Sequence, residues 1–195
     1  MVKKRLLVDG IDVGEVEASG DTDADAQRIM DFLKEKGLHR EISKDDAMHG
    51  QANSFARVAI DLYKRDLKKS PFQGHSVAPF VVNAVLSIEI YLKVLNHISG
   101  TGRGNHNLWN LYERLDDATK SVFLSAAQDV RPHYRLEDGV EIVKGLKSLS
   151  KAFENWRYLY EHNRLQTEIQ LIRYVMHVAH EACCRVRIDA ESTAV

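Results

Sequence analysis

The stretch PFVVNAVLSIEIYLKVL, residues 79–95, decides the fold. Apolar side chains surround this segment almost completely when it is drawn as a helix, and only Glu89 and Lys93 carry charge. A helix with so little polar surface is expected to be central, with other helices packed around it. Glu89 precedes Lys93 by four residues, which is the favourable order for an ion pair along a helix. We expect this pair either to be a structural contact or to line a cleft together with His106.

Amphipathic patterns predict further helices on both sides of the central stretch. The expected helices cover residues 21–37, 43–68, 106–115, 118–130, 138–162 and 164–187. We expect N-terminal caps from residues 21–23, near Ser43 and at Asp117. The first of these helices should bury a stripe of Ala26, Ile29, Met30 and Leu33. The first 18 residues differ, because Asp9-Gly10 between two apolar runs is typical of a tight β-hairpin turn, and Gly14 is the expected site of a β-bulge. The sequence therefore predicts a mostly α protein. Residues 41–190 form an up-and-down helical bundle, and residues 1–40 form an appendage of a short N-terminal β-hairpin and one helix.

Composition limits the classes of partner and compartment. The chain of 195 residues has a formal net charge of −1, which excludes a basic sheath for bulk nucleic-acid binding but allows a local basic patch. No apolar run reaches the length of a membrane span, and the first residues lack a secretory pattern, so we expect a cytoplasmic protein without membrane contact. The two cysteines, Cys183 and Cys184, are adjacent and poorly placed to bond each other. We expect them to be buried or idle, and we expect no metal ion and no cofactor.

One short segment combines aromatic, cationic and imidazole side chains. Residues 153–162 read FENWRYLYEH and contain Arg157 and His162. A neutral histidine can take a proton from a ribose 2′-hydroxyl, and an arginine can stabilise the added charge on the phosphate, so this pair could cleave RNA without a metal. Residues five apart lie about 140° apart around a straight helix. The pair can therefore meet only at a helix end or a kink.

A second arginine–histidine set lies on the last expected helix. Arg173, His177 and His180 share one side of that helix, and packing or solvation is the simplest explanation for them. Two histidines three residues apart could also bind a metal ion, but no carboxylate-rich partner set accompanies them. The motifs G-x-S-x-G, H-E-x-x-H and C-x-x-C are absent from the sequence, so no motif supports the hypothesis of a hydrolase or of a zinc site.

Several of these segments together resemble the HEPN superfamily, whose name denotes a domain of higher eukaryotes and prokaryotes associated with nucleotide binding. The resemblance covers about residues 47–188 and is most specific in the E-x-x-x-K helix followed by a glycine-rich loop and H-x-L-x-x-L-Y. It rests on residues 79–84, 88–93, 104–108, 111–112, 153, 156–158 and 160–161. The resemblance implies a bundle of four to five helices that commonly forms a homodimer.

The resemblance also implies two classes of function. Many HEPN proteins look like metal-independent endoribonucleases of toxin–antitoxin, phage-defence or RNA-processing systems, with a signature of arginine, a polar residue, three or more residues and histidine. Arg157 and His162 match this signature, whereas Tyr158 departs from the usual Asn, Asp or His. Other HEPN domains look like inactive modules that bind RNA or a partner protein.

Because of Tyr158, we expect a non-catalytic module that binds RNA, a nucleotide or a protein partner such as an antitoxin, with a role in stress or phage defence. The alternative is a metal-independent endoribonuclease in which Arg157 holds the scissile phosphate and His162 acts as acid or base. Supporting or binding roles are expected for Glu89, Lys93, His106, Tyr158, Arg173 and His180.

Overall fold

The computed structural model is mostly helical, as predicted, and has a two-stranded antiparallel hairpin at its N-terminus. It describes residues 2–8, 10–39, 41–102, 106–136, 141–150 and 168–193, with side chains up to residue 188. The chain divides into two compact units, Met1–Ile42 and Ser43–Val195, and each is described by itself below.

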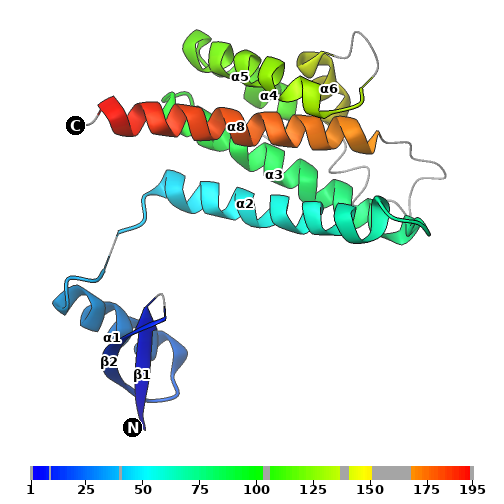
Figure 1. Cartoon of the computed structure of the whole chain (residues 1–195). Helices are drawn as coiled ribbons and strands as arrows, with labels where there is room; N and C mark the ends of the chain where they lie inside the picture. The colour runs from blue at the N-terminus through cyan, green and yellow to red at the C-terminus, as the bar shows by residue number, and fades with distance from the viewer. Residues whose placement is uncertain are drawn as a thin grey trace. The chain divides into compact units, whose positions relative to one another are not determined.

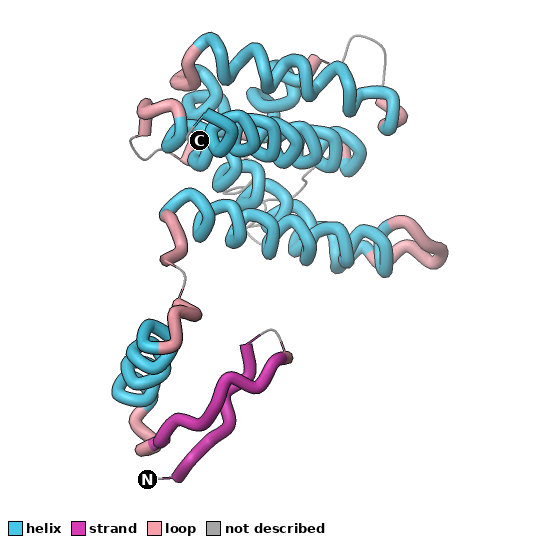
Figure 2. Tube along the Cα trace, turned by 60° about the vertical axis from the view of Figure 1, so that its left-hand side comes forward, coloured by secondary structure: helices cyan, strands magenta, loops and turns pink. Residues whose placement is uncertain are grey.

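The N-terminal unit begins with the predicted hairpin, drawn as strands in Figure 2. Strand β1 (Val2–Val8) pairs antiparallel with β2 (Ile11–Ala18), and the register shifts between Leu6 and Leu7. Leu6 lies opposite Gly14, whose φ of 129° lies in a region that glycine tolerates best, so the expected bulge is confirmed. Asp9, the first residue of the predicted turn, lies outside the described residues.

Helix α1 (Thr22–Glu35) packs against β2. The Asp21 carboxylate accepts hydrogen bonds from the backbone N–H groups of Asp23 and Ala24, which confirms the predicted N-terminal cap. The predicted apolar stripe is partly wrong, because Met30 is 41% exposed. A two-stranded hairpin covers only part of the helix, and it is the Phe32 ring that lies against the Gly14 backbone, 2.9 Å from where a Cβ would stand.

Three long helices form the centre of the second unit. Helix α2 (Lys44–Leu62) continues into a π-helical turn (Tyr63–Leu67), and α3 (Val77–Ile98) contacts both α2 and α8 (Ile169–Thr193). The three helices lie side by side in Figure 1. Ser43 caps α2 as predicted, because its hydroxyl accepts the backbone N–H of Asp46 at 3.1 Å.

Helix α3 is the central helix that the sequence predicts. It is buried around most of its circumference, and its buried side chains include Phe80, Val81, Ala84, Val85, Ile88, Tyr91, Leu92 and Leu95. Within the described part of the chain, the stretch Gly74–Ile98 is the one segment long and apolar enough to cross a membrane. Most of that stretch, 61% of its most apolar window, is buried inside the protein, as expected of a core helix.

Three shorter helices pack on α3 and α8. Helix α4 (Leu108–Glu113) contacts α3, while α5 (Asp117–Val130) and α6 (Ile142–Leu149) contact α8. The cap of α5 is Asp116, one residue before the predicted Asp117, because the Asp116 carboxylate reaches the Thr119 N–H at 2.7 Å. The predicted start of α6 at residues 138–139 lies outside the described residues.

Candidate functional site

The segment that carries the expected RNA-cleaving pair is not among the described residues. Arg157, Tyr158 and His162 all lie in residues 151–167, so their expected roles stay predictions. The other expected site residues fall into two separate groups in the structure, one around Glu89 and one around Arg173.

In the first group, Glu89 contacts both Lys93 and His106. Lys93 Nζ donates to Glu89 Oε1 at 2.6 Å, and His106 Nδ1 lies 2.9 Å from the same oxygen. Glu89 is buried, Lys93 is half-buried and His106 is exposed. A buried carboxylate needs such partners, so this cluster has a structural explanation that requires no ligand.

The second group lines a pocket between α2, α3 and α8. The cavity has a volume of about 560 Å³, within the size range of small-molecule sites. It is lined by Asn53, Ala56, Arg57, Ile60, Asp61, Lys64, Tyr91, Tyr134, Arg173, Met176, His177 and His180. Arg173 and His180, which the sequence predicts to share a side of the last helix, therefore line one cavity together with His177.

Arg173 is held in place by aromatic rings and one amide. Its Nη1 donates to Gln170 Oε1 at 2.9 Å, and its Cζ lies 3.9 Å from the centre of the Tyr63 ring and 5.2 Å from that of Tyr134. These contacts are cation–π interactions. Among the described residues no carboxylate forms an ion pair with Arg173. Its charge is thus positioned without being neutralised by that part of the chain.

The histidines of the pocket are neutral near physiological pH. Burial, with the neighbouring His180 as a second cause, lowers the pKa of His177 below its ordinary value of 6.5. Burial likewise lowers the pKa of His180. The Tyr134 hydroxyl and His177 Nδ1 share a hydrogen bond of 3.1 Å, which fixes one edge of the His177 ring. The pocket therefore offers imidazoles that can exchange protons without adding fixed charge.

A buried tyrosine closes the pocket on the α3 side. The Tyr91 hydroxyl donates to Asn53 Oδ1 at 2.6 Å, and burial raises the pKa of Tyr91, so the phenol stays protonated. The Tyr91 ring packs edge-on against His180, with 5.5 Å between ring centres. This side of the pocket is a fixed wall.

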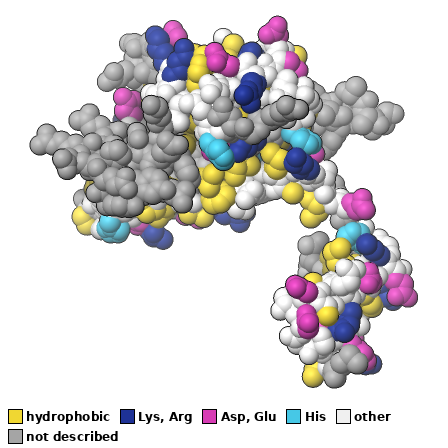
Figure 3. All heavy atoms as spheres, turned by 180° about the vertical axis from the view of Figure 1, so that it is seen from behind, with side chains coloured by type: hydrophobic (Ala, Val, Ile, Leu, Met, Phe, Trp, Pro, Cys, Tyr) yellow, Lys and Arg dark blue, Asp and Glu magenta, His cyan; other side chains and the backbone are white. Residues whose placement is uncertain are grey.

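The pocket is cationic although the chain is not. Its described lining contains three permanent cations, Arg57, Lys64 and Arg173, and one carboxylate, Asp61, whereas the whole chain has a net charge of −1. Figure 3 shows one face of the protein, where cationic, histidine and hydrophobic side chains lie close together on the helical unit. The lining thus combines positive charge with aromatic and apolar surface.

Sequence reasoning missed the contribution of α2. Arg57 and Asp61 lie on α2, and Lys64 lies in the π-helical turn that continues it. Their spacing of four and three residues places them on one helix face, and this spacing was the available signal. Tyr134 follows Pro132 in an irregular segment, and nothing in the local sequence indicates that it returns to α8.

Comparison of the chain with known proteins gave no match to a family model, to a curated protein or to a solved structure.

Proposed function

We propose that the protein is a HEPN-like binding module whose pocket between α2, α3 and α8 takes a phosphate-bearing nucleotide unit, either free or within single-stranded RNA. The observation that carries the proposal is the combination, in one cavity, of three cations with two tyrosine rings and two neutral histidines. The HEPN resemblance of the sequence independently favours RNA or nucleotide binding.

The cations fit the phosphate. Lys64 and Arg57 are exposed side chains at the mouth of the pocket, and Arg173 is half-buried. Arginine presents a planar fork of N–H donors to phosphate oxygens, and lysine presents a mobile point charge. Three such groups against one carboxylate favour a ligand with one or two negative charges.

The flat groups fit the base. The half-buried ring of Tyr134 lines the cavity, 5.2 Å from the guanidinium carbon of Arg173. Bases of single-stranded RNA stack on aromatic rings and on arginine planes, with about 1–3 kcal/mol per stacked base. A volume of about 560 Å³ leaves room for one nucleotide rather than a long strand.

Fluorescence anisotropy of a labelled single-stranded RNA, with AMP as competitor, tests this proposal. We expect Arg173→Gln to weaken binding about 10–100-fold, because it removes charged hydrogen bonds. Lys64→Ala should weaken binding and reduce the slope of log affinity against log salt by about 0.7, the value for one phosphate contact to a single strand. If AMP displaces the RNA, a free nucleotide is sufficient to occupy the pocket. If RNA binds and AMP does not displace it, the site is specific for RNA.

Lys144→Ala is the matched control, because Lys144 is an exposed lysine of α6 that lies outside the pocket lining. It should leave both affinity and salt slope close to those of the wild type. Equal losses in Lys64→Ala and Lys144→Ala would show that any binding is diffuse, and the proposal would then fail. An absence of RNA and nucleotide binding by the wild type would also refute it.

A metal-independent endoribonuclease is the second candidate. In addition to the signature at Arg157 and His162, the pocket holds Arg173 beside two histidines whose lowered pKa leaves them able to accept a proton. Cleavage of RNA in excess EDTA that is lost in His162→Ala would support the signature pair. Cleavage lost only in His177→Ala or His180→Ala would move the reaction to the pocket.

A further inference from the structure

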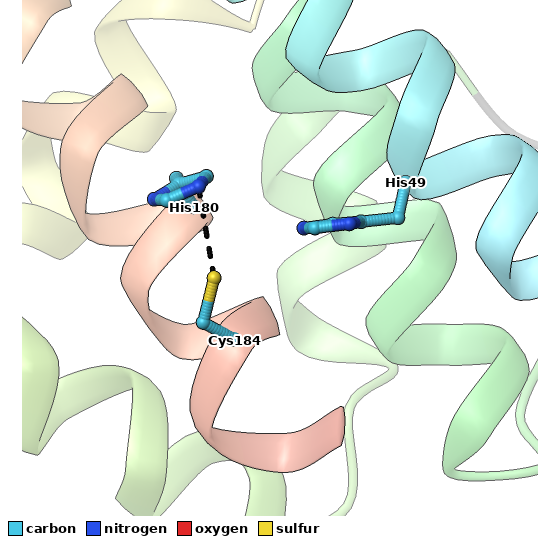
Figure 4. A group of neighbouring side chains, drawn as sticks. All are labelled: His49, His180 and Cys184. Carbon is cyan, nitrogen blue, oxygen red and sulfur yellow. Dashed lines mark hydrogen bonds between the residues drawn. The ribbon is translucent and has the colours of Figure 1, made fainter. Parts of the chain in front are cut away.

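Three potential metal ligands converge beside the pocket. His180 and Cys184 lie one turn apart on α8, and His49 reaches toward them from α2, as Figure 4 shows. One donor atom from each residue lies within 4.8 Å of the others, and His180 Nε2 is 3.6 Å from Cys184 Sγ. In tetrahedral zinc, bonds of about 2.0–2.1 Å to nitrogen and about 2.3 Å to sulfur place these two atoms about 3.6 Å apart. The α8 pair already has the required spacing.

One ring nitrogen of His49 has no hydrogen-bond partner among the described residues and is free to bind a metal ion. Its Nε2 atom is buried and makes no hydrogen bond to any described residue. The other ring nitrogen, Nδ1, lies 3.5 Å from the Asn53 side-chain amide. Asn53 presents its NH2 group to this nitrogen, because its Oδ1 accepts from the Tyr91 hydroxyl. Metal binding through Nε2 places the ring proton of His49 on Nδ1, so the Asn53 amide would turn its oxygen toward His49 and its NH2 group toward the Tyr91 hydroxyl, which can accept. A buried imidazole nitrogen without a partner costs free energy that a metal bond would recover.

We propose that His49, His180 and Cys184 bind one divalent transition-metal ion of the zinc type. Two imidazole nitrogens and one thiolate bind such borderline-soft ions in preference to magnesium or calcium. Three protein ligands leave a fourth position for water or another ligand. The sequence predicts no metal site, because the histidine nearest to His180 along its helix is His177, whereas the proposed ligands come from two helices that are distant in sequence.

The protonation states fit this role. Burial, with the charge of Arg187 as a second cause, lowers the pKa of His49, and burial lowers the pKa of His180, so both rings offer free electron pairs at neutral pH. A free thiol keeps its proton at neutral pH, and a metal-bound cysteine is a thiolate. Binding therefore exchanges one S–H proton for one metal–sulfur bond and releases one H⁺ per ion, with no change in oxidation state.

Charged groups around the cluster nearly balance. Arg187 of α8 opposes a dication, but it is paired with Asp46 of α2. Glu181 of α8 contributes a negative charge near His180 and Cys184, and it is paired with Arg185. From α3, the Tyr91 ring lies 5.9 Å and 5.5 Å from the two imidazoles and excludes water from that side. The electrostatic potential from these paired charges is therefore compatible with a divalent cation at the cluster.

Cobalt(II) is the probe, because a cobalt–thiolate bond gives a charge-transfer absorption band that zinc lacks. Chelator-treated full-length protein should show this band with one equivalent of Co²⁺, lose it on addition of one equivalent of Zn²⁺, and release about one proton per ion at neutral pH. Cys184→Ser should abolish the band and the proton release, and His49→Gln should weaken affinity at least about tenfold.

Cys183→Ser is the matched control. Cys183 is the adjacent thiol, but it is fully buried and donates to the Tyr91 carbonyl oxygen at 3.2 Å, a bond that serine can replace. This variant should keep the cobalt band. Absence of the band in the wild type, its survival in folded Cys184→Ser, or its equal loss in Cys183→Ser would overturn the proposal.

The metal proposal stands apart from nucleotide binding. His180 belongs to both the cluster and the pocket, whereas Cys184 and His49 do not line the pocket, and Arg57 and Lys64 are not part of the cluster. Lys64→Ala should therefore keep the cobalt spectrum, and failure of RNA binding would leave the metal result unchanged.

Discussion

Removing either partner of the Glu89–Lys93 pair should have unequal effects on stability. The Glu89 side chain is only 3% exposed, the Lys93 side chain is 26% exposed, and His106 is 82% exposed. In Lys93→Met the carboxylate stays buried with His106 as its remaining hydrogen-bond partner. In Glu89→Gln the ammonium that loses its partner can still reach water.

The magnitudes follow from these exposures. Removing one partner of a fully buried pair costs about 3–5 kcal/mol. Since His106 still contacts Glu89 at 2.9 Å, we expect Lys93→Met to lower the unfolding free energy by about 2–4 kcal/mol. For Glu89→Gln we expect about 1–2 kcal/mol, because the amide keeps one hydrogen-bond acceptor and Lys93 is partly solvated. The double variant should lose less than the sum, because it leaves neither charge behind.

Urea unfolding followed by tryptophan fluorescence measures these changes in unfolding free energy for the helical unit, which contains Glu89 and Lys93. Both tryptophans, Trp109 and Trp156, belong to the unit that contains Glu89, so the N-terminal unit does not contribute to the signal. In thermal unfolding, the Lys93→Met loss corresponds to a fall in Tm of about 4–16 °C. A Glu89→Gln cost equal to or above that of Lys93→Met, or a Lys93→Met cost below about 0.5 kcal/mol, would refute the reasoning.

Three further predictions concern packing, a buried hydrogen bond and pH. Gly145→Ala should lower the unfolding free energy by about 1–3 kcal/mol in urea unfolding, because the added Cβ would stand 3.0 Å from a leucine methyl of α8. Gly50→Ala in α2 is the control: its Cβ would have nothing within 4 Å, so the substitution should raise the unfolding free energy by about 0.5–1 kcal/mol. Ser76→Ala should cost about 1–3 kcal/mol in the same assay, because it removes the 2.7 Å hydrogen bond to buried Asp66. Burial lowers the pKa of His180 below 6.5, so the unfolded chain binds the His180 proton more tightly than the folded chain does. The unfolding free energy should therefore fall as the pH drops below about 6.5. His180→Gln should reduce this dependence of the unfolding free energy on pH between about pH 7 and 5.

The fold was largely predictable because its signals are local. The apolar circumference of residues 79–95 identifies a core helix, and the capping residues Asp21 and Ser43 begin their helices as expected. The shift from Asp117 to Asp116 as the cap of α5 reflects two adjacent residues with equal capping ability. Sequence pattern cannot separate them, because the choice depends on which backbone N–H group the carboxylate reaches.

The candidate sites were predictable only where the residues share an element. The Glu89–Lys93 contact and the common side of Arg173, His177 and His180 follow from helical spacing. The approach of His49 to Cys184 follows from how α2 and α8 pack against α3, and no spacing within one helix encodes it. The same holds for Tyr134, which reaches His177 from an irregular segment 43 residues earlier in the chain.

The most direct test of the proposed pocket is photochemical crosslinking of a thiouridine-substituted single-stranded RNA, followed by mass spectrometry of the modified peptides. If the pocket holds a nucleotide, the crosslinks will fall on peptides that carry Arg57–Lys64, Tyr134 and Arg173–His180, and AMP or Arg173→Gln will suppress them. Crosslinks confined to the N-terminal unit or to the surface of α5, insensitive to Arg173→Gln, would contradict the account.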